Sequence, residues 1–147
     1  MKKILILIIA LVGNHAHPAE NSKKEIISTN EAPKAIGPYS QAVRVGNTLY
    51  LSGQIAIDPI KGKLVQGGIE EQTHQVLKNI KAVLNASGFV LSDVVQSQVY
   101  LSDLNNYGAM NRIYASYFIN DPPARAAIQA SRLPLNALVE IMVTAVK

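Results

Sequence analysis

The spacing of the apolar residues changes along the chain, and this change constrains the fold more than any other feature of the sequence. Between Ala42 and Ile57 apolar and small residues alternate as in a β-strand, and the pair Gly46-Asn47 interrupts the run as a hairpin turn would. From Ile69 onward apolar residues recur every three or four positions, which is the spacing of an α-helix. The 147 residues therefore combine strands and helices in one ordinary domain.

Two helices and four more strands are predicted from the remaining patterns. The first helix begins at Ile69 and has Gly88 as its stop signal. A strand follows from Val94 to Leu101, and Asp103 is the expected N-cap of a second helix. One face of that helix is rich in tyrosine and is interpreted as core with its hydroxyls at the rim; it carries Leu104, Tyr107, Met110, Tyr114 and Tyr117. Asn120 to Pro123 end that helix, because proline cannot continue it. The other predicted strands run from Glu25 to Ser28, from Arg125 to Leu133 and from Val139 to Val146. The order β-β-β-α-β-α-β-β describes an α+β domain.

The hairpin contains a glycine inside its second strand. In the predicted alternation one face of this strand carries Leu49, Leu51, Gly53, Ile55 and Ile57. Glycine weakens a strand unless a bulge or a closely approaching group requires it. Both interpretations of Gly53 are kept: a β-bulge, or a ligand pressed against the backbone.

Two amphipathic helices cover one face of such a sheet and leave the other face bare. The hairpin strand is apolar on both faces, since Tyr50 and Ala56 lie on the second. An apolar sheet face of this kind exceeds the few hundred Å² that monomers tolerate. We therefore expect a closed homo-oligomer with sites at its interfaces.

The N-terminal residues are typical of a secretory signal peptide. Lys2 and Lys3 precede an apolar run from Ile4 to Val12, which is about half the length of a membrane-spanning helix. We expect residues 1–19 to be removed after Ala19, residues 20–25 to form a linker and residues 26–147 to form the domain. The protein would then be periplasmic or secreted, with no membrane anchor. An uncleaved leader on a cytoplasmic protein is the alternative.

Charge and composition argue against several classes of function. The full chain has a net charge of +4, and removal of Lys2 and Lys3 leaves 12 basic and 10 acidic residues, a net charge of +2. Aromatic residues make up 5% of the chain, so electrostatic attraction and base stacking both offer little to a nucleic acid. The chain has no cysteine, which excludes disulfides, thiolate catalysis and cysteine-bound metals.

Two charged residues lie in the C-terminal strands. Arg125 opens one strand after Pro122 and Pro123, and Glu140 interrupts an otherwise uncharged strand, which we expect to be its neighbour. A carboxylate in such surroundings should be paired, hydrogen-bonded or raised in pKa. One interpretation is a structural ion pair that bridges subunits. In the other, Arg125 holds a substrate carboxylate while Glu140 positions or activates a water.

Several ordered motifs resemble those of the RidA family, also called YjgF or L-PSP. They are Ala35 to Ala42 (AIGPYSQA), Leu51 to Gln54 (LSGQ), Leu101 to Leu104 followed by Asn111, and the C-terminal series Pro123 to Ile128, Leu133-Pro134 and Val139 to Ile141. The resemblance extends from about Ile26 to Lys147, and a typical member lacks the leader. The chain departs at Ala126 and Ala127, where many members have serine, threonine or cysteine. Substrate preference is therefore less defined than reaction type.

The resemblance implies a chorismate-mutase-like fold, with a mixed six-stranded sheet, two helices on one face and a homotrimer with three clefts between subunits. It implies hydrolytic deamination of reactive 2-enamino and 2-imino acids, of the 2-iminobutanoate and 2-iminopropanoate type, without metal or other cofactor. Arg125 would clamp the carboxylate and Glu140 would orient the water. The cleft would be lined by Tyr39, Ser52, Gly53, Asn111 and the backbone at Ala127.

Two other functions are kept as alternatives. A trimer that binds small carboxylates without turnover would use the same residues. An endoribonuclease or translation inhibitor, an activity attached to the L-PSP name, has less support. His74 is the single histidine outside the leader region, so the sequence offers no histidine pair for acid–base cleavage of RNA.

Overall fold

A computed structural model describes residues 23–147; the predicted signal peptide and residues 20–22 of the predicted linker lie outside the described residues. The two α-helices of this part of the chain are α1 (Ile69–Ala86) and α2 (Tyr107–Tyr117), and short 3₁₀ turns lie at η1 (Leu91–Asp93), η2 (Leu104–Asn106) and η3 (Pro134–Asn136). Its strands are β1 (Glu25–Ile27), β2 (Ala42–Val45), β3 (Thr48–Leu51), β4 (Ile57–Asp58), β5 (Lys63–Leu64), β6 (Val94–Leu101), β7 (Ala124–Gln129) and β8 (Val139–Val146). None of the described helices is long and apolar enough to span a membrane.

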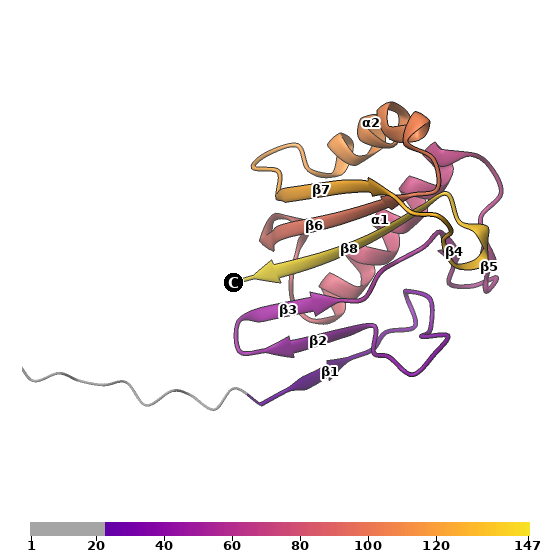
Figure 1. The fold of residues 1–147 in the computed structure, drawn as a ribbon. Coiled ribbons are helices and arrows are strands. Elements are labelled where there is room, and N and C mark those ends of the chain that lie inside the picture. The colour runs from indigo at the N-terminus through magenta and orange to yellow at the C-terminus, as the bar shows by residue number, and fades with distance from the viewer. Residues whose placement is uncertain (1–22) are drawn as a thin grey trace, which may run out of the picture.

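Six of the strands form one mixed sheet in the order β1-β2-β3-β8-β6-β7 (Figure 1). All neighbouring strands are antiparallel except β6 and β7, which run parallel. A parallel pair needs a crossover connection, and α2 supplies it. The predicted six-stranded mixed sheet with two helices is confirmed. The small hairpin formed by β4 and β5 was not predicted, because each strand has only two residues.

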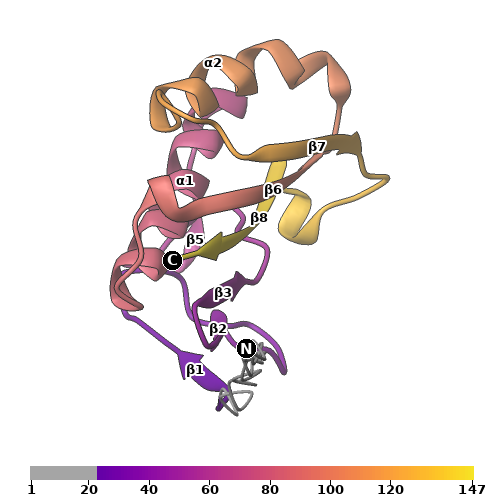
Figure 2. The ribbon, with the colours of Figure 1, turned by 90° about the vertical axis from the view of Figure 1, so that its left-hand side faces the viewer.

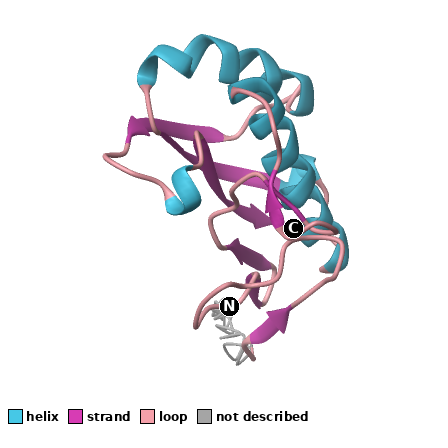
Figure 3. Cartoon of the chain, turned by 90° about the vertical axis from the view of Figure 1, so that its right-hand side faces the viewer, coloured by secondary structure: helices cyan, strands magenta, loops and turns pink. Residues whose placement is uncertain are grey.

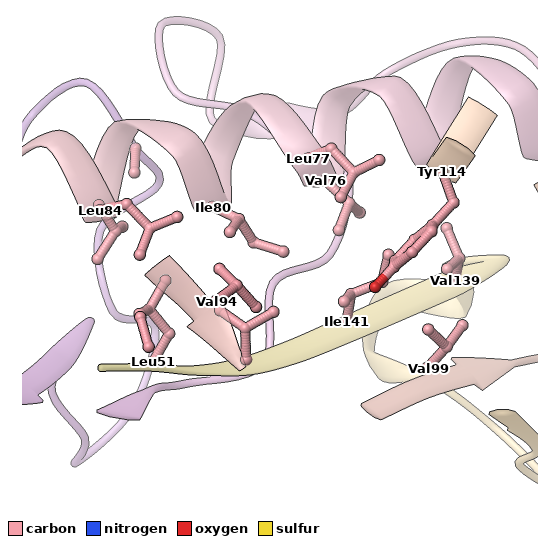
Figure 4. Close-up of a cluster of buried hydrophobic side chains, with 14 of the residues drawn as sticks. Leu51, Val76, Leu77, Ile80, Leu84, Val94, Val99, Tyr114, Val139 and Ile141 are labelled. Atoms are coloured by element: carbon pink, nitrogen blue, oxygen red, sulfur yellow. The ribbon is translucent and has the colours of Figure 1, made fainter. Parts of the chain in front are cut away.

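Both helices pack on the same face of the sheet (Figures 2 and 3). The predicted stripe of α1 is buried, with Val76, Leu77, Ile80, Val83 and Leu84 all at 0% exposure. In Figure 4 the side chains of Val76, Leu77, Ile80 and Leu84 are directed at strand residues, which include Leu51, Val94 and Ile141. Burial of each large aliphatic side chain stabilises the fold by about 1.5 to 3 kcal/mol. Within residues 23–147 no α-helix lies on the other face of the sheet, which carries only the short 3₁₀ turn η3.

The predicted alternation of the hairpin strand is wrong beyond Leu51. Strand β3 ends there, and Gln54 resumes pairing as an isolated bridge to Ile141, with N–H···O distances of 2.9 and 3.0 Å. The irregularity at Gly53 shifts the pattern by one residue, so Ala56 joins Leu51 in the main core. The residues expected on that face instead form a second cluster with the loop before β8: Ile55, Ile57, Leu133 and Ala137.

Two other boundaries differ from the sequence prediction. The strand predicted to reach Leu133 ends at Gln129, beyond which the chain turns into the loop that contains η3. The tyrosine-rich face of α2 is only partly core. Met110 and Tyr114 are buried, whereas Tyr107 is 39% exposed.

Buried amide side chains fasten the loops to this framework. Asn79 on α1 donates from its amide to the carbonyls of Ile55 and Ile57, at 3.1 and 2.9 Å. Gln41 donates to three carbonyls of the loop at 29–33 and accepts from the N–H of Thr29. Gln72 accepts from the N–H of Leu138 at 2.9 Å. Each amide satisfies backbone groups that have no strand partner, and the loops are thereby held in one conformation.

Replacing Asn79 by alanine is expected to lower the free energy of unfolding by about 1 to 3 kcal/mol, because the buried carbonyl of Ile57 loses its side-chain donor and that of Ile55 keeps only the N–H of Ile57. Urea unfolding of the Asn79→Ala variant measures this loss. Lys78→Ala is the control, because Lys78 is the exposed residue that precedes Asn79 on the same helix. Its free energy of unfolding should stay within about 0.5 kcal/mol of that of the parent. Equal stability of the two variants would show that Asn79 does not fasten the segment.

Candidate active site

The predicted site residues fall into two groups on opposite faces of the sheet. Arg125 on β7 faces α2, whereas Glu140 on β8 lies on the face without helices. The expectation that their strands are neighbours is wrong, because β6 lies between β7 and β8 (Figure 1). The parallel register instead pairs Arg125 with Ser97, and the antiparallel register pairs Glu140 with Tyr100. One chain therefore does not bring Arg125 and Glu140 together.

The first group surrounds a hollow of about 360 Å³ on the face without helices. It contains four of the predicted residues: Tyr39, Ser52, Gly53 and Glu140. Its remaining wall is mostly apolar and includes Ile36, Ile55, Ile57, Pro134 and Met142. We call this group the Glu140 half-site. A carboxylate beside an apolar wall suits a small ligand that has a polar reacting centre and an aliphatic side chain.

The side chain of Glu140 leaves no room for a side chain at residue 53, which is a glycine. A methyl group built on the Gly53 backbone would lie 2.0 Å from Glu140 Oε1 and 2.9 Å from its Cδ. The φ angle of Gly53 is not in the left-handed region, so space and not backbone conformation requires glycine here. The break in strand pairing around Gly53 agrees with the first of the two interpretations, an irregular strand. The group that approaches the backbone closely is the Glu140 carboxylate of the chain itself, not the ligand that the second interpretation expected.

The two hydroxyls of the Glu140 half-site differ in the hydrogen bonds that they can still make to a ligand. Ser52 donates its O–H to the carbonyl of Ser40 at 2.7 Å, so it can meet a ligand only as an acceptor. Tyr39 accepts from the N–H of Ile36 at 3.2 Å and keeps its own proton. The side chain of Tyr39 is 48% exposed, so this proton is accessible to a ligand.

Burial raises the pKa of the Glu140 carboxyl above its ordinary value of 4.5. A carboxylate that is partly withdrawn from water binds a proton more readily. Glu140 is therefore a stronger base than an exposed glutamate, which suits the acceptance of a proton from water.

The second group surrounds a hollow of about 480 Å³ between α2 and the edge strand β7. It contains the other three predicted residues, Asn111, Arg125 and Ala127, and we call it the Arg125 half-site. The guanidinium lies over the ring of Tyr114, with 4.5 Å from Cζ to the ring centroid, and Arg125 Nη2 donates to the Tyr107 hydroxyl at 3.1 Å. No carboxylate among residues 23–147 forms a salt bridge with Arg125. Most of its N–H donors are therefore available to an anion.

Two tyrosines of the Arg125 half-site were assigned to the core by the sequence analysis. Tyr107 and Asn111 are four residues apart on α2 and therefore share a helix face, a spacing that could have linked them. Tyr114 is buried and serves as the platform for the guanidinium. In the described part of the chain, no three histidine, aspartate or glutamate side chains converge as metal ligands.

The comparisons place this chain in a known family. The model of the family described as endoribonuclease L-PSP matches residues 29–147, which is most of the chain. The chain therefore belongs to the RidA family, also called YjgF or L-PSP, as the motifs indicated.

Relatives of the chain carry more than one name. A RutC family protein of Pyrococcus horikoshii is 53% identical over 124 residues, which are 84% of this chain and 98% of that protein. The 2-iminobutanoate/2-iminopropanoate deaminase of mouse is 48% identical over 124 residues, covering 84% of this chain and 92% of that enzyme. The crystal structure of E. coli TdcF with bound serine has a TM-score of 0.81 and 35% identity, covering 84% of this chain and 98% of that one.

The replacement Gly53→Ala tests the close approach of Glu140. The added methyl meets the flexible end of a side chain, so we expect the free energy of unfolding to fall by no more than about 1 kcal/mol. A crystal structure of the variant should show the Glu140 carboxylate moved away from residue 53. Gly108→Ala on α2 is the control. Its methyl would meet no atom within 4 Å, and it should raise stability by about 0.5 to 1 kcal/mol. An unmoved Glu140 would contradict the steric account.

Proposed function

We propose that the protein hydrolyses reactive 2-imino acids, and the enamines in equilibrium with them, to 2-oxo acids and ammonia. The observation that carries this proposal is the pair of half-sites. One offers a guanidinium with free donors, and the other offers a partly buried carboxylate with a raised pKa. The mammalian relatives named as imine deaminases support the same reaction.

The proposed enzyme is a homotrimer in which the Arg125 half-site of one subunit meets the Glu140 half-site of the next. The half-sites lie on opposite faces of a single sheet, so they can share a substrate only across an interface. The sheet face without helices supplies apolar surface for that interface. Its exposed side chains include Ile26, Tyr50 and Ile128, at 53%, 53% and 52% exposure. A closed trimer would form three such clefts.

The proposed chemistry divides between the two half-sites. Arg125 holds the substrate carboxylate, and this fixes the neighbouring C=N carbon in the cleft. Glu140 accepts a proton from a water whose oxygen attacks that carbon, while the electron pair of the C=N bond moves to nitrogen and takes up a proton. In the resulting carbinolamine the hydroxyl proton is transferred to the nitrogen, the C–N bond breaks to release ammonia, and the C=O bond of the 2-oxo acid forms. Glu140 is the group placed to move these protons.

Two observations favour particular alternatives. The serine bound to TdcF fits a trimer that binds small carboxylates without turnover, and the endoribonuclease description of the family names RNA as a substrate. For RNA cleavage in this chain, His74 is poorly placed, since its Nδ1 lies 3.2 Å from the Tyr117 hydroxyl and outside both half-sites.

Removing either charged group tests the assignment of roles. We expect Arg125→Ala to reduce kcat/KM for 2-iminobutanoate generated in situ by about a hundredfold or more, because the carboxylate loses its charged partner. Glu140→Gln should reduce kcat by about 10² to 10⁴. The assay follows the 2-oxo acid formed, and light scattering checks that each variant keeps a mass three times that of one chain.

The surface ion pair Arg112–Glu70, with 2.7 Å between Nη2 and Oε1, provides matched controls. Arg112→Ala and Glu70→Gln should leave kcat/KM within about twofold of the parent, since exposed pairs contribute little. Full activity of Arg125→Ala would contradict the deaminase. Binding without turnover in the parent would favour the carboxylate-binding trimer. RNA cleavage that survives both site variants would favour the ribonuclease.

The raised pKa of Glu140 predicts how activity depends on pH. In the enzyme–substrate complex the substrate carboxylate neutralises Arg125, so burial is left as the main influence on Glu140. A raised pKa means that the carboxylate form is lost at a higher pH than for an exposed glutamate. We therefore expect kcat to fall with decreasing pH through a midpoint above 4.5. The residual kcat of Glu140→Gln should not show this fall at low pH. A midpoint at or below pH 4.5 in the parent would contradict the account.

A further inference from the structure

The first turn of α2 places the hydroxyl of Tyr107 inside the Arg125 half-site. Arg125 Nη2 donates to this oxygen at 3.1 Å, and Arg125 Cζ lies 5.7 Å from the centroid of the Tyr107 ring. Tyr107, Asn111 and Arg125 line the same hollow. With 39% of its surface exposed, Tyr107 can be reached by a ligand that enters the hollow.

The hydrogen bonds of the Tyr107 hydroxyl define its chemical role. A phenolic oxygen accepts hydrogen bonds and has one proton to donate. The polar Asn111 side chain and the positive charge of Arg125 lower the pKa of Tyr107. Since Arg125 donates to the phenolic oxygen, the Tyr107 proton is directed away from the guanidinium. Within residues 23–147 this O–H has no acceptor.

The neighbouring Tyr114 cannot play the same part. Its ring lies under the guanidinium, but its hydroxyl is buried and has no hydrogen-bond partner among the described residues. Figure 4 shows this oxygen directed inward, among Val99, Val139 and Ile141. Of these two tyrosines beside Arg125, only Tyr107 presents a donor to the hollow.

We propose that Tyr107 is a further substrate-binding residue, which donates its O–H to the carboxylate that Arg125 holds. This inference rests on the proposed function, because it takes from it the carboxylate at Arg125. A carboxylate has about four acceptor positions on its two oxygens, and a guanidinium fills two of them at most in a bidentate pair. A hydroxyl bonded to the same guanidinium lies within reach of a remaining position. Tyr107 thus adds a directional contact to the charge of Arg125.

The test compares Tyr107→Phe with Tyr117→Phe in the assembled protein. Both changes remove one hydroxyl from α2, but Tyr117 lies outside the Arg125 half-site and bonds to His74. Calorimetry measures the Kd of 2-oxobutanoate, which carries the carboxylate and is not consumed. We expect Tyr107→Phe to raise Kd and KM by about tenfold, with kcat within about twofold, because the contact holds substrate and transition state alike. Tyr117→Phe should change neither.

A double variant separates direct donation from an effect through Arg125. In the Arg125→Lys background the guanidinium is gone but the charge remains, and Tyr107→Phe should still weaken binding. If its effect disappears there, Tyr107 acts only by positioning Arg125, and the inference is wrong. It is also wrong if kcat falls while Kd is unchanged, since the hydroxyl would then serve the reacting atoms.

The same measurements distinguish failure of this inference from failure of the proposed function. If the parent protein deaminates and binds 2-oxobutanoate, and Tyr107→Phe behaves like Tyr117→Phe, only the inference fails. If the parent binds 2-oxobutanoate without deaminating 2-iminobutanoate, and Tyr107→Phe weakens that binding, the inference holds and the enzymatic function fails. If the parent does neither, both fail.

Discussion

The structure depends on a sheet that is covered on one face only. The stripe of α1 and part of α2 bury one face, and the strands alternate so that their other side chains point away from the helices. Glu140 and Arg125 lie on opposite sides of this sheet because β8 and β7 present different phases of the same alternation. A site that uses both residues therefore needs a second subunit, and the bare face offers the surface for one.

Within each half-site a few contacts fix the functional groups. Glu140 lies against the backbone of Gly53, where a larger residue would displace it, and Arg125 is held by the ring of Tyr114 and the hydroxyl of Tyr107. The buried amide side chains act at a greater distance from the functional groups. By satisfying carbonyls at 55 and 57, Asn79 holds the segment that forms the wall beside Glu140. The precision of the site thus comes from packing and hydrogen bonds on rigid elements.

Local patterns predicted the elements well and their partners less well. The spacing of apolar residues located α1, β6 and β8, and the prolines before Arg125 located the end of the helix that precedes β7. The alternation of the segment from Gly53 to Ile57 was predicted wrongly, because an irregularity at Gly53 moves the following side chains of this segment to the opposite face. The motifs indicated seven candidate site residues, but not that the fold divides them into groups of four and three.

By itself the sequence determined which residues are apolar, which segments form strands or helices, and which charged groups lie among uncharged neighbours, because each of these is a local property. Only the tertiary structure decided that β6 separates β7 from β8, that the Glu140 carboxylate is the reason for Gly53, and that Tyr107 shares a hollow with Arg125. These features join residues far apart in the chain. They follow from strand order and from the packing of α2 on the sheet edge, and no local pattern encodes either.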